Sequence, residues 1–228
     1  MLAIVSVLAL VTLLLTAFGS GAPERQTAAA APAPAVETAV TPEPEVLASV
    51  SNLRIQLPVA AEAVTAIGFH GAGGDAIALQ PVGRQANEGV LARLWRRIAG
   101  SPRTGPLWYR LDGSSDTEVL NVGAVPGTDV YAPVTGTVVA ISDYVIDGKA
   151  YGARIDLRPS DAPSVTVSLT HLRADPSLAV GSPLSAATSK LGTVVDVAAA
   201  ERQALAKHAR ADGNNVAIEV HPAAGSLP

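Results

Sequence analysis

Apolar and polar residues alternate in short runs over most of the chain after residue 52, a pattern typical of β-strands with one buried face. Gly and Pro residues separate the runs, as expected for turns. Pro58 ends the first run because proline cannot donate to a hydrogen-bond ladder. Strands are therefore predicted at residues 53–57, 64–69, 107–111, 138–145, 151–157, 165–172 and 215–221.

The dipeptide Asp147-Gly148 between two of these runs predicts a β-hairpin. A two-residue turn of this kind needs positive φ angles, which glycine adopts without steric penalty. We therefore expect a long central hairpin made from residues 138–145 and 151–157.

Two segments have features of helices. Residues 87–100 carry apolar side chains at helical spacing and end at Gly100, and residues 198–210 precede Gly213, a residue common just after helices. Strands nevertheless dominate. The predicted fold class is mainly β, an antiparallel sandwich or barrel-like domain with two peripheral helices.

Residues 2–18 form an apolar run without a charged residue, which predicts an N-terminal apolar helix acting as a signal peptide or membrane anchor. Residues 20–51 are rich in Ala and Pro and predict a disordered linker. The expected organisation is therefore a signal or anchor at 1–19, the linker at 20–51, a β domain at 52–222 and a tail at 223–228. We expect an exported protein.

Composition narrows the function classes. The 228-residue chain has a net charge of -4, which gives no reason to expect nucleic-acid binding. It contains no cysteine, so disulfides and thiolate metal sites are excluded. Aromatic residues are 4% of the chain, so the core must be built mainly from aliphatic side chains.

Several motifs in the second half occur together. Gly-Thr-Asp-Val at 127–130 is followed by Ala-Pro-Val-Thr-Gly-Thr-Val at 132–138, Tyr-Gly-Ala-Arg-Ile-Asp-Leu at 151–157, Thr-Val-Ser-Leu-Thr-His-Leu at 166–172 and Asn-Val-Ala-Ile-Glu-Val at 215–220. In this order they resemble the lysostaphin-type (LytM-type) zinc endopeptidases, which cut peptidoglycan cross-bridges. The resemblance implies the duplicated hybrid motif fold of that family.

The resemblance also implies that the zinc site is degenerate. Thr117, Asn121 and Ala217 occupy the positions of the three zinc ligands of the family. His171 matches a catalytic histidine, although its motif is one residue longer than in the family, and Asn215 replaces a second histidine that assists catalysis. These five positions are expected to be vestigial groove positions, with no catalytic residue and no metal or other cofactor.

A relocated zinc site remains an alternative, with His70, His171 and His221 as candidate ligands. In the last predicted strand, Glu219 and His221 share a face with Asn215, because side chains alternate along a strand. The residues expected to line a ligand-binding groove are His70, His171, Asn215, Glu219 and His221.

Three functions follow from the resemblance. The first is a non-catalytic cell-envelope domain that binds peptidoglycan or regulates a cell-wall hydrolase. The second is a divergent zinc metalloendopeptidase acting on peptidoglycan cross-bridges, and the third is a structural envelope domain without a ligand. The expected partners are peptidoglycan or a cell-wall hydrolase, and the membrane through the N-terminal segment. The chain is expected to be membrane-anchored facing the cell wall, or secreted.

Overall fold

The computed structural model describes residues 41–89, 105–111, 113 and 115–223. The predicted signal or anchor, most of the linker, most of the helix predicted at 87–100 and all but the first residue of the tail lie outside these ranges. Within the described ranges, no helix is long and apolar enough to cross a membrane.

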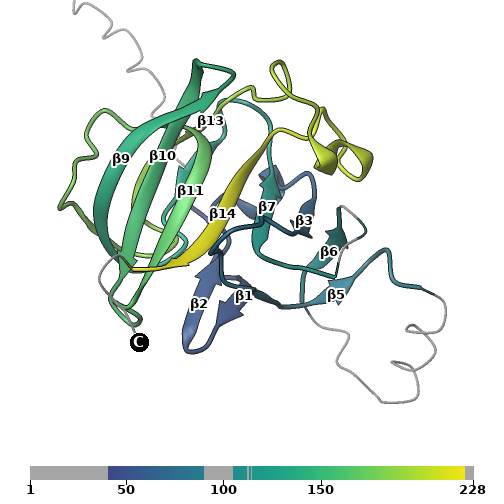
Figure 1. Cartoon of the computed structure of the whole chain (residues 1–228), viewed down its shortest axis with the longest axis horizontal. Coiled ribbons are helices and arrows are strands. Elements are labelled where there is room, and N and C mark those ends of the chain that lie inside the picture. The colour runs from purple at the N-terminus through teal and green to yellow at the C-terminus, as the bar shows by residue number, and fades with distance from the viewer. Residues whose placement is uncertain (1–40, 90–104, 112, 114, 224–228) are drawn as a thin grey trace, which may run out of the picture. The chain divides into compact units, whose positions relative to one another are not determined.

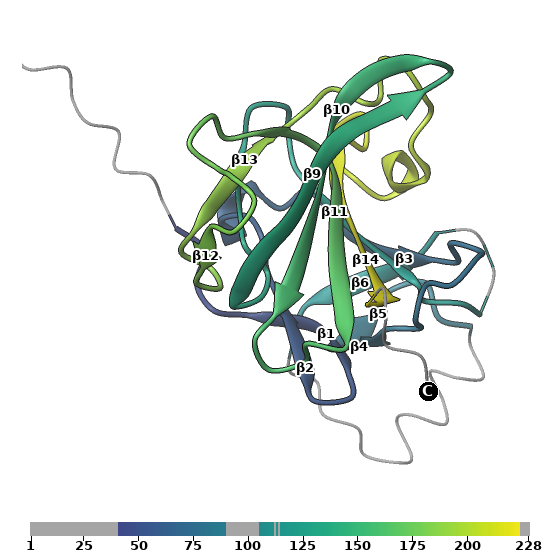
Figure 2. The same ribbon diagram turned by 60° about the vertical axis from the view of Figure 1, so that its left-hand side comes forward.

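One large sheet organises the described part of the chain (Figures 1 and 2). All strand pairs in it are antiparallel except β3–β6 and β5–β6. The mainly β fold class is thus confirmed. In spatial order the strands are β12 (Pro183–Leu184), β9 (Gly136–Ile146), β10 (Lys149–Pro159), β11 (Val165–Ala174), β14 (Asn215–Pro222), β7 (Val119–Gly123), β3 (Ile67–His70), β6 (Leu107–Arg110) and β5 (Arg84–Gln85).

Two further strands branch from this order. β13 (Lys190–Val194) pairs with the end of β11 and also with β8 (Asp129–Tyr131). A separate three-stranded sheet contains β2 (Leu53–Gln56), β1 (Val46–Val50) and β4 (Gln80–Pro81), in that order.

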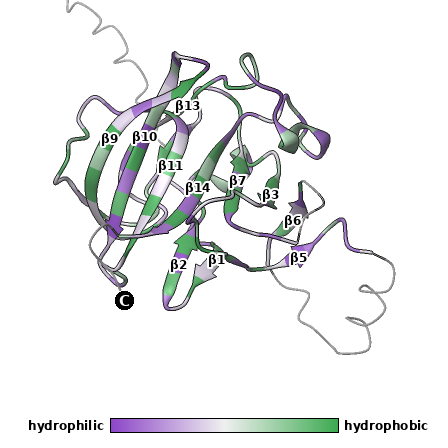
Figure 3. Cartoon of the chain, viewed as in Figure 1, coloured by the Kyte–Doolittle hydropathy of each residue, from purple (hydrophilic) through white to green (hydrophobic). Residues whose placement is uncertain are grey.

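Alternate residues along the strands are apolar and point to one face of the large sheet, and the hydrophobic core lies on that face. Val216, Ile218 and Val220 of β14 have no exposed surface, and each contributes roughly 1.5–3 kcal/mol by burial. The hydrophobic and hydrophilic bands along β10 and β14 in Figure 3 reflect this alternation. The odd-numbered residues of β14 therefore face away from the core, where they are available for a site.

Strand β1 corrects the predicted extent of the linker. It lies inside residues 20–51, which were predicted to be disordered, and it pairs with β2 through a tight turn at Ser51. Leu47 is almost completely buried, which explains why this segment is ordered. The Ala and Pro bias of the preceding residues concealed a short apolar strand at the end of the segment.

The helix predicted at 198–210 is wrong. Only one short 3-10 turn, η2 (Ala204–Lys207), is present there, and the described residues contain no helix of seven residues or more. The side chain of Asn214 accepts a hydrogen bond from the Ala198 backbone N–H at 2.8 Å. Nearby, Asp196 Oδ1 accepts a hydrogen bond from the Ala199 backbone N–H at 3.2 Å. Local side-chain bonds of this second kind compete with the helical ladder, and only Leu205 of the turn is buried.

The predicted hairpin is confirmed. Ile146 of β9 pairs with Lys149 of β10, which leaves Asp147 and Gly148 as the two turn residues. Their φ angles are 49° and 79°, as a turn that matches the twist of the two strands requires.

We predict that Gly148→Ala lowers the free energy of unfolding by about 1 kcal/mol, because alanine is strained at this positive φ. A Cβ at Gly148 would meet no atom within 4 Å, so crowding does not contribute. Urea unfolding measures the loss. Gly89→Ala is the matched control, since that position is equally open and has no positive φ. Equal losses in the two variants would contradict the turn argument.

Candidate functional site

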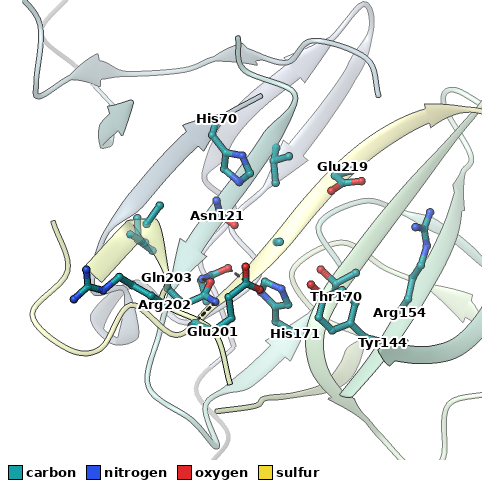
Figure 4. A pocket seen from close by; sticks show the side chains of 15 residues that line it. His70, Asn121, Tyr144, Arg154, Thr170, His171, Glu201, Arg202, Gln203 and Glu219 are labelled. Atoms are coloured by element: carbon teal, nitrogen blue, oxygen red, sulfur yellow. Dashed lines mark hydrogen bonds between the residues drawn. The ribbon is translucent and has the colours of Figure 1, made fainter. Parts of the chain in front are cut away.

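A pocket of about 340 Å³ opens on the side of the sheet opposite the core (Figure 4). It is formed by strands from both halves of the large sheet and by the segment that precedes β14. Its lining residues are His70, Val119, Asn121, Tyr144, Arg154, Thr170, His171, Glu201, Arg202, Gln203, Ala204, Leu205, Asn215, Ala217 and Glu219.

The floor of the pocket is set by strand register. Ala217 of β14 pairs with Asn121 of β7 on one side and with Thr170 of β11 on the other. Side chains that are paired directly across antiparallel strands lie on the same face. The backbone ladder therefore places these three residues together without help from the side chains themselves.

His171 and Asn215 form a buried hydrogen-bonded pair beside this floor. The distance between His171 Nδ1 and Asn215 Oδ1 is 3.1 Å. The amide orientation is fixed, because Asn215 Nδ2 donates to the backbone oxygen of Gly213 at 2.8 Å. Oδ1 can only accept, so Nδ1 of His171 is the donor. The neutral ring then carries its lone pair on Nε2.

A β-bulge brings His171 to the pocket. On β11, Leu169 pairs with Ile155 of β10 while Leu172 pairs with Ala153, so β11 carries one residue more than its partner. His171 takes up this extra residue with a φ of 66°, a left-handed conformation that is uncommon for a residue other than glycine. The bulge thus accommodates the extra residue of the motif at 166–172. As a result, Thr170 and His171 both line the pocket.

Burial and two carboxylates determine the protonation of the aromatic groups in the pocket. Burial lowers the pKa of His171, and this effect is partly opposed by its hydrogen bonds to Asn215 and by the charges of Glu201 and Glu219. Burial also raises the pKa of Tyr144, and the same two carboxylates raise it further. The Tyr144 ring packs edge-on against His171 at a centroid distance of 4.9 Å. His171 is therefore held neutral and in one orientation.

The segment between β13 and β14 forms one wall of the pocket. Gln203 accepts a hydrogen bond from Asn215 Nδ2 at 3.0 Å, which ties the wall to the floor. Leu205 packs with Ala66 and Leu111 in a small second core. His208 stacks on Tyr109 at 4.3 Å. The wall is consequently fixed at several points although it is not helical.

Six of the eight residues singled out from the sequence line the pocket: His70, Asn121, His171, Asn215, Ala217 and Glu219. Thr117 is not one of them, since its hydroxyl donates to the backbone oxygen of Leu79 at 2.6 Å. His221 also lies outside the lining. Its ring bridges Asp75 Oδ1 at 3.1 Å and Glu219 Oε2 at 3.0 Å.

Sequence reasoning missed Tyr144, Arg154, Glu201 and Gln203, which complete the walls of the pocket. In the sequence, Tyr144 and Arg154 are ordinary members of the two predicted hairpin strands. Glu201 and Gln203 lie in the segment predicted to be a helix. The alternation of polar and apolar residues along β10 indicates in part that Arg154 lies on the polar face. Its Nε is 2.9 Å from Asp156 on the same face of that strand.

The residues at the three positions where the resemblance implies zinc ligands do not fit a zinc ion. Asn121 offers only a neutral amide, Ala217 offers no donor atom, and the Thr117 hydroxyl is turned away to Leu79. The described residues contain no group of three or more His, Asp or Glu side chains arranged to hold a metal. What the pocket offers instead is a set of pre-oriented hydrogen-bonding groups.

No family model and no curated protein matches this chain. Two solved structures of Csd3 from Helicobacter pylori are similar to it. The structure from the hexagonal crystal has 12% identity and a TM-score of 0.40, over 77% of this chain and 32% of Csd3. The structure from the orthorhombic crystal has 16% identity and a TM-score of 0.33, over 47% of this chain and 24% of Csd3. The chain thus spans at most about a third of that protein, and a likeness at this level carries no argument about function.

We predict that His171 makes stability depend on pH. Its pKa is lowered on folding from an ordinary value of 6.5, so the unfolded chain binds the proton first. The contribution of the neutral ring is therefore present above about pH 6.5 and is lost progressively as the pH falls below it. Urea unfolding at about pH 7.5 and about pH 5.5 measures the difference. In His171→Gln, which cannot titrate, the fall should be smaller; an unchanged fall would contradict the assignment.

Proposed function

We propose that this chain is a non-catalytic, LytM-like domain of the cell envelope whose pocket binds a peptide of peptidoglycan. The motifs at residues 127–138 and 151–172 support the family, and the convergence of Asn121, His171, Asn215 and Ala217 on one pocket supports the assignment of the vestigial positions. The observation that carries the proposal is Ala217. It lines the pocket at a position where the resemblance implies a zinc ligand, and its side chain has no atom that could bind a metal.

The chemistry of the donor groups argues against peptide hydrolysis. A catalytic zinc needs three protein ligands and a free position for water. The metal must then lower the pKa of that water before it can attack an amide at neutral pH. The neutral amide of Asn121 and the methyl group of Ala217 do not supply zinc ligands. The hydrogen-bond partner of His171 is the amide of Asn215 and not a carboxylate.

The polar groups of the pocket favour binding of a peptide. Asn121, Thr170 and Gln203 offer neutral amide and hydroxyl groups, which are suited to peptide N–H and C=O groups. Several of them are fixed by register or by hydrogen bonds within the pocket. Such pre-organisation reduces the entropy that a binding surface loses when the ligand arrives.

Relocated zinc ligands are the alternative enzyme proposal. His70 and His171 line the pocket, but His221 is held outside it between Asp75 and Glu219. Regulation of a cell-wall hydrolase through the same pocket is a further proposal, as is a purely structural role. Export and membrane anchoring through residues 1–19 remain predictions from the sequence.

We predict that the purified full chain, dialysed against trace zinc, holds much less than one zinc per chain and sediments with purified sacculi. Ala217→Leu should fill the floor of the pocket and weaken sedimentation at least about tenfold, because a shape mismatch in a binding pocket removes contacts. Ala61→Leu, at an exposed residue outside the pocket, is the matched control. Circular dichroism confirms that both variants fold.

The two measurements separate the proposals. One zinc per chain together with release of muropeptides from the sacculi would establish the enzyme alternative. Equal sedimentation of Ala217→Leu and Ala61→Leu would place peptidoglycan binding outside the pocket. No zinc and no sedimentation would leave hydrolase regulation or a structural role.

A further inference from the structure

The guanidinium of Arg154, on strand β10, is held at the pocket by two hydrogen bonds on one of its sides. Its Nε donates to Asp156 Oδ1 at 2.9 Å, and its Nη2 donates to the hydroxyl oxygen of Ser168 at 2.8 Å. The Ser168 hydroxyl donates in turn to the same oxygen of Asp156 at 2.7 Å. Ser168 is almost completely buried, so this closed network is anchored in the sheet and fixes the plane of the guanidinium.

These contacts use only one edge of the guanidinium. The group has five N–H donors in a rigid plane, and the two donors that contact Asp156 and Ser168 lie side by side on the edge formed by Nε and Nη2. The second donor of Nη2 and a parallel donor of Nη1 form another edge, which has no hydrogen-bond or ion-pair partner among the described residues. The Arg154 side chain is 39% exposed and lines the pocket, so this second edge is accessible to a ligand.

The other carboxylates of the pocket do not occupy this edge. Glu201 and Glu219 line the pocket, but neither forms an ion pair with Arg154 within the described ranges. Glu219 is paired with His221 at 3.0 Å. Figure 4 shows Glu201 on the other side of the pocket from Arg154. The carboxylate that contacts Arg154 is that of Asp156, which lies on the first edge and leaves the second edge to an acceptor from outside the chain.

We propose that the free edge of the Arg154 guanidinium binds a carboxylate group of the wall peptide through two parallel hydrogen bonds. This inference rests on the proposed function, since it names the part of the peptide that the pocket recognises. Two parallel N–H donors match the two oxygens of a carboxylate, and such charge-assisted hydrogen bonds are roughly twice as strong as neutral ones. Because Asp156 and Ser168 already fix the guanidinium, Arg154 loses little side-chain entropy when the ligand binds.

The first test compares two forms of the same wall material. The full chain is sedimented with purified sacculi, freed of phosphate polymers, whose carboxylates are either left intact or converted to methylamides. The conversion removes the negative charge and one acceptor oxygen, so we expect binding to weaken about tenfold or more, as does the loss of a charged hydrogen bond. Equal binding of both forms would overturn the carboxylate assignment and leave the proposed function in place. Failure to bind either form would overturn both.

Variants of Arg154 test the residue itself. Arg154→Gln should weaken binding to intact sacculi about tenfold or more and should bind the two forms equally. Arg154→Lys keeps the charge and should still bind more weakly than the unchanged chain, because an ammonium group cannot form the bidentate pair. Arg158→Gln is the matched control, since Arg158 is an exposed arginine on the same strand outside the pocket. Circular dichroism checks that all three variants fold. Equal binding by Arg154→Gln and Arg158→Gln would overturn the assignment of Arg154.

A soluble probe identifies the recognised group directly. The tripeptide L-alanyl-γ-D-glutamyl-L-lysine carries free carboxylates and should bind the full chain in a calorimetric titration. Its form with every carboxylate converted to an amide should bind at least about tenfold more weakly. Tripeptide binding that is unchanged in Arg154→Gln would show that another part of the chain holds the carboxylate, which would overturn the proposal.

Discussion

The site depends on the hydrogen bonds of the Asn215 side chain. Its amide is almost completely buried and joins three separate parts of the chain: it accepts from His171 on β11, and it donates to the backbone of Gly213 and to Gln203 in the wall. The bond to Gly213 fixes the amide, the amide fixes the tautomer of His171, and the bond to Gln203 fixes the wall. A buried polar group that is satisfied in this way orders its surroundings, whereas the same group without partners would destabilise the fold.

The surrounding sheet explains why this contact can form. β14 presents Val216, Ile218 and Val220 to the core and Asn215, Ala217 and Glu219 to the other face. A shift of one residue in its pairing would bury the polar set and expose the apolar one. The hydrophobic core therefore enforces the register, and the register places the polar residues of β7, β11 and β14 in one pocket.

Features that depend on local sequence could be predicted. The hairpin followed from Asp147-Gly148, and the two faces of β14 followed from its alternation. The family resemblance, not local patterning, placed Asn121, His171, Asn215 and Ala217 in one groove together with Thr117; the first four line the pocket and Thr117 does not. Features that depend on contacts between distant segments could not be predicted. Glu201 reaches the pocket because Gln203, Leu205 and His208 attach its segment to other elements. Strand β1 is ordered by pairing with β2 and β4 and by burial of Leu47.

The bulge at His171 has a consequence for the evolution of such domains. Leu169 and Leu172 on either side of it are both fully buried, so the core is continuous across the insertion. Thr170 and His171 are adjacent in sequence, yet both reach the pocket, which strict alternation would not allow. Insertion of a single codon within a strand is thus a route by which a sheet can add a side chain to a pocket while its hydrophobic core keeps its original residues.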